Sequence, residues 1–155
     1  ATSAYVCVHF FLEEIMNNNY LEKLIELASK SLETDDVPIG AIIVKNDNII
    51  AEGINTRQKD QNILGHAEIN AVLQAQKIIN NWNLSDCDLY VTLKPCSMCM
   101  EIIKQSRIKT VYYLLDKPSY KKEFYKTEIK EIESLEIKEM YAKKLSDFFK
   151  KMREK

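Results

Sequence analysis

The chain has 155 residues and a formal net charge of −1, with 46 % hydrophobic and 29 % charged residues. This length can bury a core without disulfides or a structural metal. No apolar run is long enough for a transmembrane helix, the start of the chain lacks the pattern of a signal peptide, and the four cysteines do not form a secreted disulfide framework. These features favour a soluble, cytoplasmic protein without a membrane partner, in which Cys7 and Cys87 are small core residues.

The first predicted element is an amphipathic helix over about 19–32, where apolar residues recur at helical spacing. Residues 1–18 precede this periodic pattern and are expected to be an N-terminal extension. Met16 within the extension is a candidate start of the natural protein. Residues 19–155 are expected to form a single domain.

The rest of the chain alternates between strand and helix patterns. Two β-branched segments, 41–44 and 49–54, flank an Asn/Asp turn and predict a β-hairpin. The later predicted elements are a buried helix over 66–80, a strand over 88–93, a short helix over 96–106, a strand over 109–115, an edge strand over 129–133 and a final helix over 137–152. This order predicts an α/β fold with three α/β/α layers and a mixed five-stranded sheet.

Two short motifs combine the ligands that zinc prefers with a carboxylate. His66 and Glu68 lie in His-Ala-Glu, and Cys96 and Cys99 lie in Pro-Cys-Ser-Met-Cys. Three protein ligands leave the fourth position of a tetrahedral zinc free for water, as in catalytic sites. Both motifs fall at predicted helix starts, where the helix N-terminus is expected to lower the pKa of the thiols. We therefore expect one catalytic zinc per subunit, hydrolysis as the reaction and Glu68 as the proton carrier.

These motifs have two other common interpretations. A Cys-x-x-Cys pair also occurs in redox sites and in four-ligand structural zinc sites, and a histidine on an apolar helix is often a core residue. No second ligand pair closes a structural site, and neither reading gives Glu68 a role. The sequence does not distinguish zinc from iron, so iron is an alternative metal for this site.

His-x-Glu followed by Pro-Cys-x-x-Cys is the signature of the zinc-dependent nucleobase deaminases. Over about 20–155 the chain resembles the bacterial tRNA-specific adenosine deaminases of the cytidine/deoxycytidylate deaminase superfamily, with the clearest likeness in segments 37–41, 53–55, 89–93, 106–108 and 145–149. The resemblance implies a cytidine-deaminase-like domain that converts adenosine to inosine at the wobble position of tRNA anticodons. In that reaction zinc-activated water attacks C6 of adenine and Glu68 shuttles protons. The resemblance also implies a homodimer, for which the candidate interface or core residues are Met98, Met100, Ile102 and Ile103.

The residues expected to hold the substrate lie outside the metal motif. The resemblance implies that Asn55 hydrogen-bonds the base, although a residue directly after a strand can also be an ordinary turn residue. For a tRNA anticodon stem-loop, the final helix offers Phe148 and Phe149 for stacking on a base and Lys150 and Lys151 for phosphates. Alternatively, the two phenylalanines pack this helix on the sheet.

The metal motif does not choose the base, because cytidine and guanine deaminases use the same centre. A deaminase of a free base or nucleoside, such as guanine, cytosine or cytidine, is therefore the alternative function. A third hypothesis is a non-catalytic zinc protein that binds RNA, and Glu68 argues against it.

Overall fold

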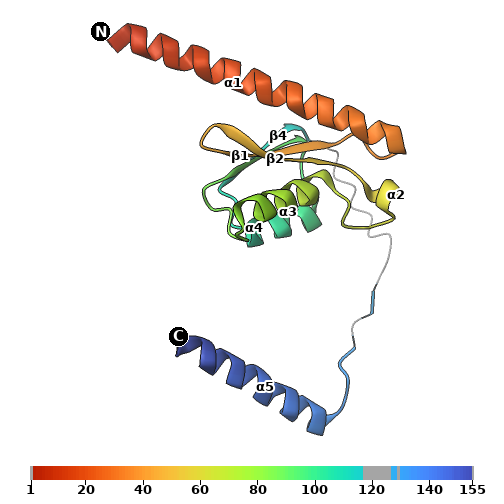
Figure 1. The fold of residues 1–155 in the computed structure, drawn as a ribbon. Coiled ribbons are helices and arrows are strands. Elements are labelled where there is room, and N and C mark those ends of the chain that lie inside the picture. The colour runs from red at the N-terminus through yellow and green to blue at the C-terminus, as the bar shows by residue number, and fades with distance from the viewer. Residues whose placement is uncertain (1, 117–126, 129, 155) are drawn as a thin grey trace. The chain divides into compact units, whose positions relative to one another are not determined.

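The computed structural model describes residues 2–116, 127–128 and 130–154, the side chains of 2–12 and 15 excepted. They belong to two units, residues 1–118 and 119–155. The first unit contains a sheet with the strand order β2-β1-β3-β4 (Figure 1). Its strands are β1 (Gly40–Lys45), β2 (Asn48–Ile54), β3 (Asp88–Leu93) and β4 (Thr110–Leu115). β1 pairs antiparallel with β2 and β3, whereas β3 and β4 run parallel, so the sheet is mixed as predicted.

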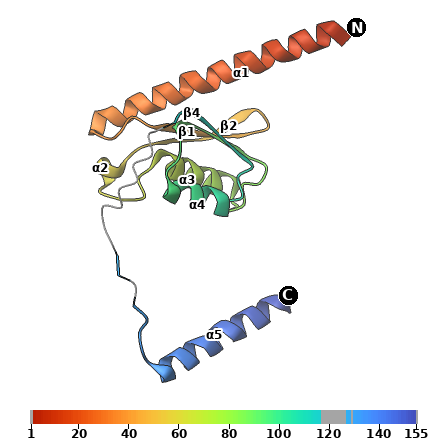
Figure 2. The same cartoon turned by 180° about the vertical axis from the view of Figure 1, so that it is seen from behind.

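Helices cover both faces of this sheet, which confirms the three predicted layers. The helices of the first unit are α1 (Thr2–Ser31), α2 (Arg57–Asp60), α3 (Ala67–Ile79) and α4 (Ser97–Gln105). Helix α1 lies on one face, and α3 and α4 lie on the other (Figures 1 and 2). Successive residues of a strand point to opposite faces. In β1, Ile42 and Val44 are therefore buried with α1, whereas Ala41 and Ile43 are buried with α3 and α4.

The hairpin between β1 and β2 closes through the predicted Asn/Asp turn. Asn46 and Asp47 have φ values of 49° and 62°. A two-residue hairpin loop with positive φ at both positions has the twist that suits the flanking strands, and Asn and Asp tolerate this conformation. The local sequence therefore determines both the turn and the pairing of the two strands.

Two glycines set how closely the helices approach the sheet. A Cβ atom on Gly40 in β1 would lie 2.4 Å from the backbone oxygen of Leu24 in α1. On the other face, a Cβ atom on Gly53 in β2 would lie 2.1 Å from the backbone oxygen of Ala67 in α3. Backbone atoms cannot rotate away from such a clash. A side chain at either position would therefore push α1 or α3 off the sheet.

None of the three glycines of the chain has a positive φ. Other residues occupy the left-handed positions. Asp35, Gln61 and Asn80 end the short helix η1 (Leu32–Thr34), α2 and α3 in this conformation, and Arg107 has a φ of 65°. The left-handed conformation costs an ordinary L-residue roughly 1–2 kcal/mol.

Helix α1 begins at Thr2, well before the predicted start at residue 19. Among the side chains of α1 that the structure describes, the buried ones are Tyr20, Leu24, Leu27, Ala28 and Ser31. The periodic pattern thus locates these buried residues. Met16, which precedes the predicted start, also packs against the same core cluster. The short helices η1 and α2 were not predicted, because so few residues carry no periodic signal.

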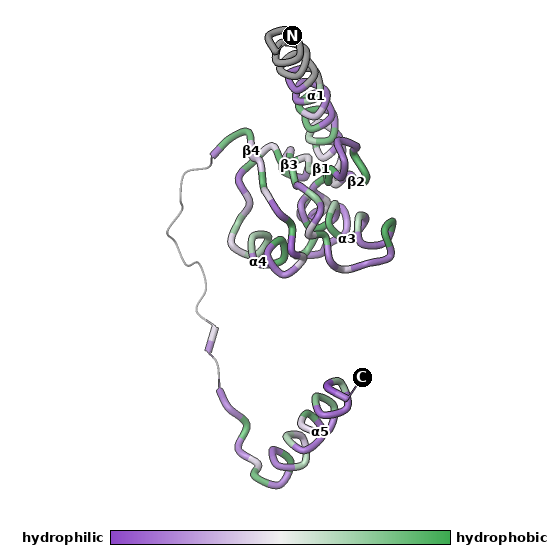
Figure 3. The backbone as a smooth tube through the Cα atoms, turned by 90° about the vertical axis from the view of Figure 1, so that its left-hand side faces the viewer, coloured by the Kyte–Doolittle hydropathy of each residue, from purple (hydrophilic) through white to green (hydrophobic). Residues whose placement is uncertain are grey.

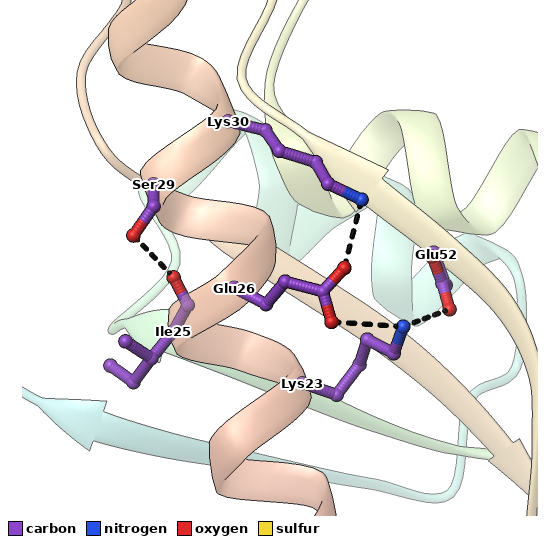
Figure 4. Close-up of polar contacts among 6 residues, drawn as sticks. All are labelled: Lys23, Ile25, Glu26, Ser29, Lys30 and Glu52. Atoms are coloured by element: carbon purple, nitrogen blue, oxygen red, sulfur yellow. Dashed lines mark hydrogen bonds and ion pairs between the residues drawn. The ribbon is translucent and has the colours of Figure 1, made fainter.

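Ion pairs connect the solvent-exposed side of α1 to the edge strand β2. Lys23 lies 3.2 Å from Glu26 and 3.3 Å from Glu52, and Glu26 also pairs with Lys30 at 2.9 Å (Figure 4). The hydrogen bonds and charges of Glu26 and Glu52 raise the pKa of Lys23. Exposed pairs of this kind are screened by solvent and contribute little to stability.

The predicted fifth strand over 129–133 is wrong. Residues 130–133 have no regular secondary structure, and the described part of the chain forms one sheet of four strands. Ile129 lies outside the described residues, and Ile132 is 87 % exposed. A strand is stable only when another strand pairs with it. An alternating pattern of residues does not show whether such a partner exists.

The second unit contains the final predicted helix, α5 (Leu135–Arg153). Hydrophobic and hydrophilic residues alternate around it, as the colours along the tube in Figure 3 show. Its last turn carries Lys150, Lys151 and Arg153, so its C-terminal end is basic. Neither α5 nor any other helix in the described residues has the length and apolar character needed to cross a bilayer.

Candidate metal centre

The histidine and the two cysteines singled out by the sequence meet at the N-termini of two helices. His66 is the N-cap residue of α3, Cys96 is the N-cap residue of α4, and Cys99 lies in the first turn of α4. The Sγ atoms of Cys96 and Cys99 lie 3.7 and 3.4 Å from Nδ1 of His66. All three ligating atoms lie within 4.8 Å of one another. Residues far apart in the sequence thus form one cluster.

The separations between these atoms fit a tetrahedral metal. Zinc bonds of about 2.3 Å to sulfur and about 2.0 Å to nitrogen, at a tetrahedral angle, place the two ligand atoms about 3.5 Å apart. The observed nitrogen–sulfur distances of 3.4 and 3.7 Å lie on either side of that value. Two thiolates and an imidazole also form a donor set that zinc prefers. The cluster is therefore compatible with zinc, and it offers three ligand atoms, the number of protein ligands that a catalytic zinc uses.

The electrostatics of Cys99 differ from the prediction. Burial raises the pKa of the Cys99 thiol, and the nearby Glu68 carboxylate and Cys96 sulfur raise it further. The prediction that the helix N-terminus lowers the pKa of this thiol is wrong for the polypeptide alone, because Cys99 is fully buried. A divalent cation among the sulfurs would reverse this balance. The thiolate of Cys99 is thus expected to form together with metal binding.

Glu68 lies beside the cluster without being part of it. It occupies the first turn of α3 and is 4 % exposed. Its carboxylate is close enough to Cys99 to influence the titration of that thiol. A buried carboxylate next to three ligands is suitably placed to exchange protons with a group bound at the fourth position.

Asn55 lies directly after β2, as the sequence indicates, and is 6 % exposed. Its backbone N–H donates to the carbonyl of Ile39 and to the hydroxyl of Ser31. Its side-chain Oδ1 is buried and has no hydrogen-bond partner among the described residues. A buried carbonyl oxygen without a partner costs about 1–3 kcal/mol. This side chain therefore has an unused acceptor, unlike an ordinary turn asparagine.

The loop between Asn55 and His66 is held by groups that the sequence analysis missed. The backbone N–H of Thr56 donates to the carbonyl of Gly65 at 2.8 Å, which closes the loop at its base. The buried carboxylate of Asp36 accepts hydrogen bonds from the backbone N–H groups of Gln58 and Lys59. Desolvation opposes the ionisation of Asp36, but these bonds and the hydroxyl of Thr34 outweigh it and lower its pKa. The three residues before Asp36 are polar as well, so no sequence signal distinguishes it.

The other sulfur-containing and apolar candidates belong to the core. Cys87 is fully buried, which confirms its predicted core position, and burial raises its pKa to about 11. The side chain of Cys7 lies outside the described residues. Ile103 is buried, whereas Met98, Met100 and Ile102 are half-buried against the same core cluster.

The candidate RNA contacts lie on α5, in the second unit. Phe148 and Phe149 are each 55 % exposed and contact each other edge to face, with ring centroids 5.4 Å apart. Lys150 and Lys151 are also exposed. These four residues therefore present aromatic and basic groups at one end of one helix.

Comparison with known proteins identifies related enzymes. Residues 15–153 match the model of the MafB19-like deaminase family. The tRNA-specific adenosine deaminase of Rickettsia bellii is 41 % identical over 95 residues, which cover 60 % of this chain and 66 % of that protein. The chain spans between 55 % and 66 % of the length of the curated relatives of this kind, and so less than two thirds.

Two solved structures resemble the fold. A tRNA:A34 deaminase, solved in relation to A-to-I editing at the wobble position of transfer RNA, has a TM-score of 0.61 at 35 % identity and covers 63 % of this chain and 75 % of its own. Guanine deaminase from Bacillus subtilis has a TM-score of 0.65 at 27 % identity and covers 81 % of this chain and 93 % of its own. The likeness thus includes both an RNA-editing and a free-base deaminase.

Proposed function

The chain belongs to the MafB19-like deaminase family, and we propose that it deaminates adenosine to inosine at the wobble position of tRNA anticodons. The observation that carries this proposal is the cluster of His66, Cys96 and Cys99 beside the buried Glu68. The choice of substrate is supported by the relative named tRNA-specific adenosine deaminase and by the likeness to a tRNA:A34 deaminase.

In the proposed reaction, His66, Cys96 and Cys99 hold one zinc ion per subunit. Zinc, when bound, supplies a Lewis acid that makes water nucleophilic near neutral pH. Glu68 takes a proton from the attacking water and delivers it to N1 of the adenine. The water oxygen forms a bond to C6, and the remaining proton of this water passes through Glu68 to the amine at C6. The C6–N bond then breaks, ammonia leaves, and the oxygen stays on C6 as the carbonyl of inosine. The burial of Glu68 keeps these transfers away from bulk solvent.

Asn55 is the proposed contact to the base. Its Oδ1 has no hydrogen-bond partner among the described residues and can accept a hydrogen bond from the substrate. The backbone bonds of Asn55 to Ser31 and Ile39 hold the residue in place. A substrate that supplies the donor would remove the cost of the unpaired oxygen.

Helix α5 is the proposed contact to the anticodon stem-loop. Lys150 and Lys151 would bind phosphates, and Phe148 or Phe149 would stack on an unpaired base. Support comes from the sequence of this helix end, which places two aromatic and two basic side chains in succession. A free base carries no phosphate for such a surface to bind.

Replacing Lys150 and Lys151 by alanine is expected to weaken RNA binding. The slope of log Kobs against log salt should become shallower by about 1 for each phosphate that the variant no longer binds. Fluorescence anisotropy of a labelled anticodon stem-loop at several salt concentrations measures this slope. Lys138→Ala with Lys143→Ala is the matched control, since these lysines lie on α5 but pair with acidic residues. An unchanged slope in the first variant contradicts the proposed RNA contact.

The alternative function is deamination of guanine. It is favoured by one observation, the larger coverage and TM-score of the Bacillus subtilis guanine deaminase. Cytosine and cytidine remain further free substrates for the same centre.

The choice between these functions is tested by direct comparison of substrates. The zinc-loaded protein is incubated with an anticodon stem-loop carrying adenosine at the wobble position, and separately with guanine, cytosine, cytidine and adenosine. We expect inosine in the stem-loop and no ammonia from the free compounds. Ammonia from guanine alone would replace the proposal with its alternative, and a stem-loop with guanosine at the wobble position controls for unspecific hydrolysis.

We also propose that the protein forms a homodimer in the cytoplasm. The half-buried Met98, Met100 and Ile102 on α4, next to the candidate ligands, supply apolar surface for a second subunit. The cytoplasm contains tRNA and keeps cysteines reduced, as the metal ligands require.

A further inference from the structure

Asn70 connects two parts of the proposed active site that are separate in the sequence. Its backbone N–H donates to the carbonyl of His66 at 3.0 Å. Its side-chain Nδ2 donates to the carbonyl of Ile54 at 2.8 Å and to Oγ1 of Thr56 at 3.0 Å. Ile54 and Thr56 are the residues on either side of Asn55. One side chain on α3 thus holds the backbone around Asn55, and its own backbone bonds to the first candidate ligand.

The need for this contact follows from the strand order. β2 is an edge strand, so one of its sides has no neighbouring strand to pair with its backbone. Two α3 side chains one turn apart bond to this strand instead. Asn70 donates to the carbonyl of Ile54, and Oε1 of Gln74 accepts from the N–H of Glu52 at 2.6 Å. Of these two side chains, Asn70 is the one that reaches the end of β2 next to Asn55.

The contacts of Asn70 form part of a closed chain of hydrogen bonds. Thr56 accepts from Asn70 through its side chain and donates through its backbone to Gly65, the residue before His66. Thr56 is therefore held from two directions, both leading to the start of α3. Both N–H groups of an amide are needed for two separate acceptors, so neither leucine nor aspartate can replace Asn70 in this arrangement.

We propose that Asn70 is a positioning residue that sets Asn55 relative to His66, and thereby places the base against the metal centre. This inference rests on the proposed role of Asn55 in binding the base. Asn70 itself touches neither substrate nor metal in this scheme. Replacement of Asn70 should therefore lower kcat/KM only because it displaces Asn55.

A double-mutant cycle tests the proposal. Asn70→Leu removes both donors while keeping a side chain of similar size, and kcat/KM on the stem-loop should fall about tenfold or more, as expected for one lost transition-state hydrogen bond. The same substitution in an Asn55→Ala background should cause no further fall. Full additivity of the two losses would overturn the proposal. If Asn70→Leu does not fold, Asn70→Ser serves as the second variant.

Gln74→Leu is the matched control, because it removes the neighbouring contact between α3 and β2 without touching the residues around Asn55. It should lower the melting temperature but leave kcat/KM unchanged. An equal loss of kcat/KM in this variant would show that Asn70 has only a structural role.

A second readout needs no substrate. Hydrogen exchange of the backbone in residues 54–57 should accelerate in the zinc-loaded Asn70→Leu variant but not in Gln74→Leu. Unchanged exchange would overturn the positioning role. If the wild-type protein deaminates none of the offered substrates, the proposed function fails, while the exchange measurement still decides whether Asn70 orders this segment.

Discussion

Replacement of Glu68 by glutamine is expected to abolish deamination while zinc binding is retained. Glutamine keeps the size and hydrogen-bonding capacity of the side chain but cannot accept a proton and return it. Loss of a general acid–base group lowers kcat by about 10²–10⁴-fold, and Glu68 is proposed to act in more than one proton transfer. Product formation on the stem-loop and the metal content per chain measure the two effects independently.

Glu101→Gln is the matched control for this experiment. Glu101 lies on α4, close in sequence to the candidate ligands, but its side chain is 68 % exposed and pairs with Lys104. Its substitution should leave kcat unchanged. Substantial activity in Glu68→Gln would remove the proton-carrier role, whereas loss of zinc in that variant would assign Glu68 to the metal site itself.

Replacement of Cys99 by alanine is expected to remove both the metal and the activity. Substitutions behind a metal ligand already cost about 10–100-fold in affinity, and removal of a ligand that is fully buried should cost more. The wild-type protein should also gain thermal stability on addition of zinc, by about 2.7 kcal/mol when free zinc exceeds Kd 100-fold. Cys99→Ala should lose most of this gain, as measured by differential scanning fluorimetry and metal analysis.

Cys87→Ala provides the matched control, because Cys87 is equally buried but belongs to the core. Its substitution should lower the melting temperature while the zinc content and kcat stay at wild-type values. Full zinc content in Cys99→Ala would contradict the proposed ligand set.

Local patterns predicted the parts of this fold whose causes are local. The positive φ values of Asn46 and Asp47 follow from the residue types, so the hairpin was predictable from the local sequence. Strand β3 has the predicted bounds, 88–93, because its apolar run is delimited by polar residues. The convergence of His66 with Cys96 and Cys99 was predictable because each motif begins a helix.

The predictions that failed concern structural features whose cause lies elsewhere in the chain. The fifth strand over 129–133 required a pairing partner that its own residues cannot reveal. Burial and the neighbouring Glu68 and Cys96 raise the pKa of Cys99, and the local sequence reveals neither the burial nor these neighbours. Asn70 is one of several polar residues of α3, and its sequence position does not distinguish it from the others. Its acceptors become apparent only once β2 is known to be an edge strand.

The use of glycine reverses the usual expectation for mutational tolerance. Glycines are normally irreplaceable at turns, but here Gly40 and Gly53 are irreplaceable because helices lie against them. The turn positions of Gln61 and Arg107, in contrast, hold long side chains in left-handed conformation. A laboratory selection for heat resistance should therefore yield substitutions to glycine at Gln61 and Arg107. It should yield no substitutions at Gly40 and Gly53.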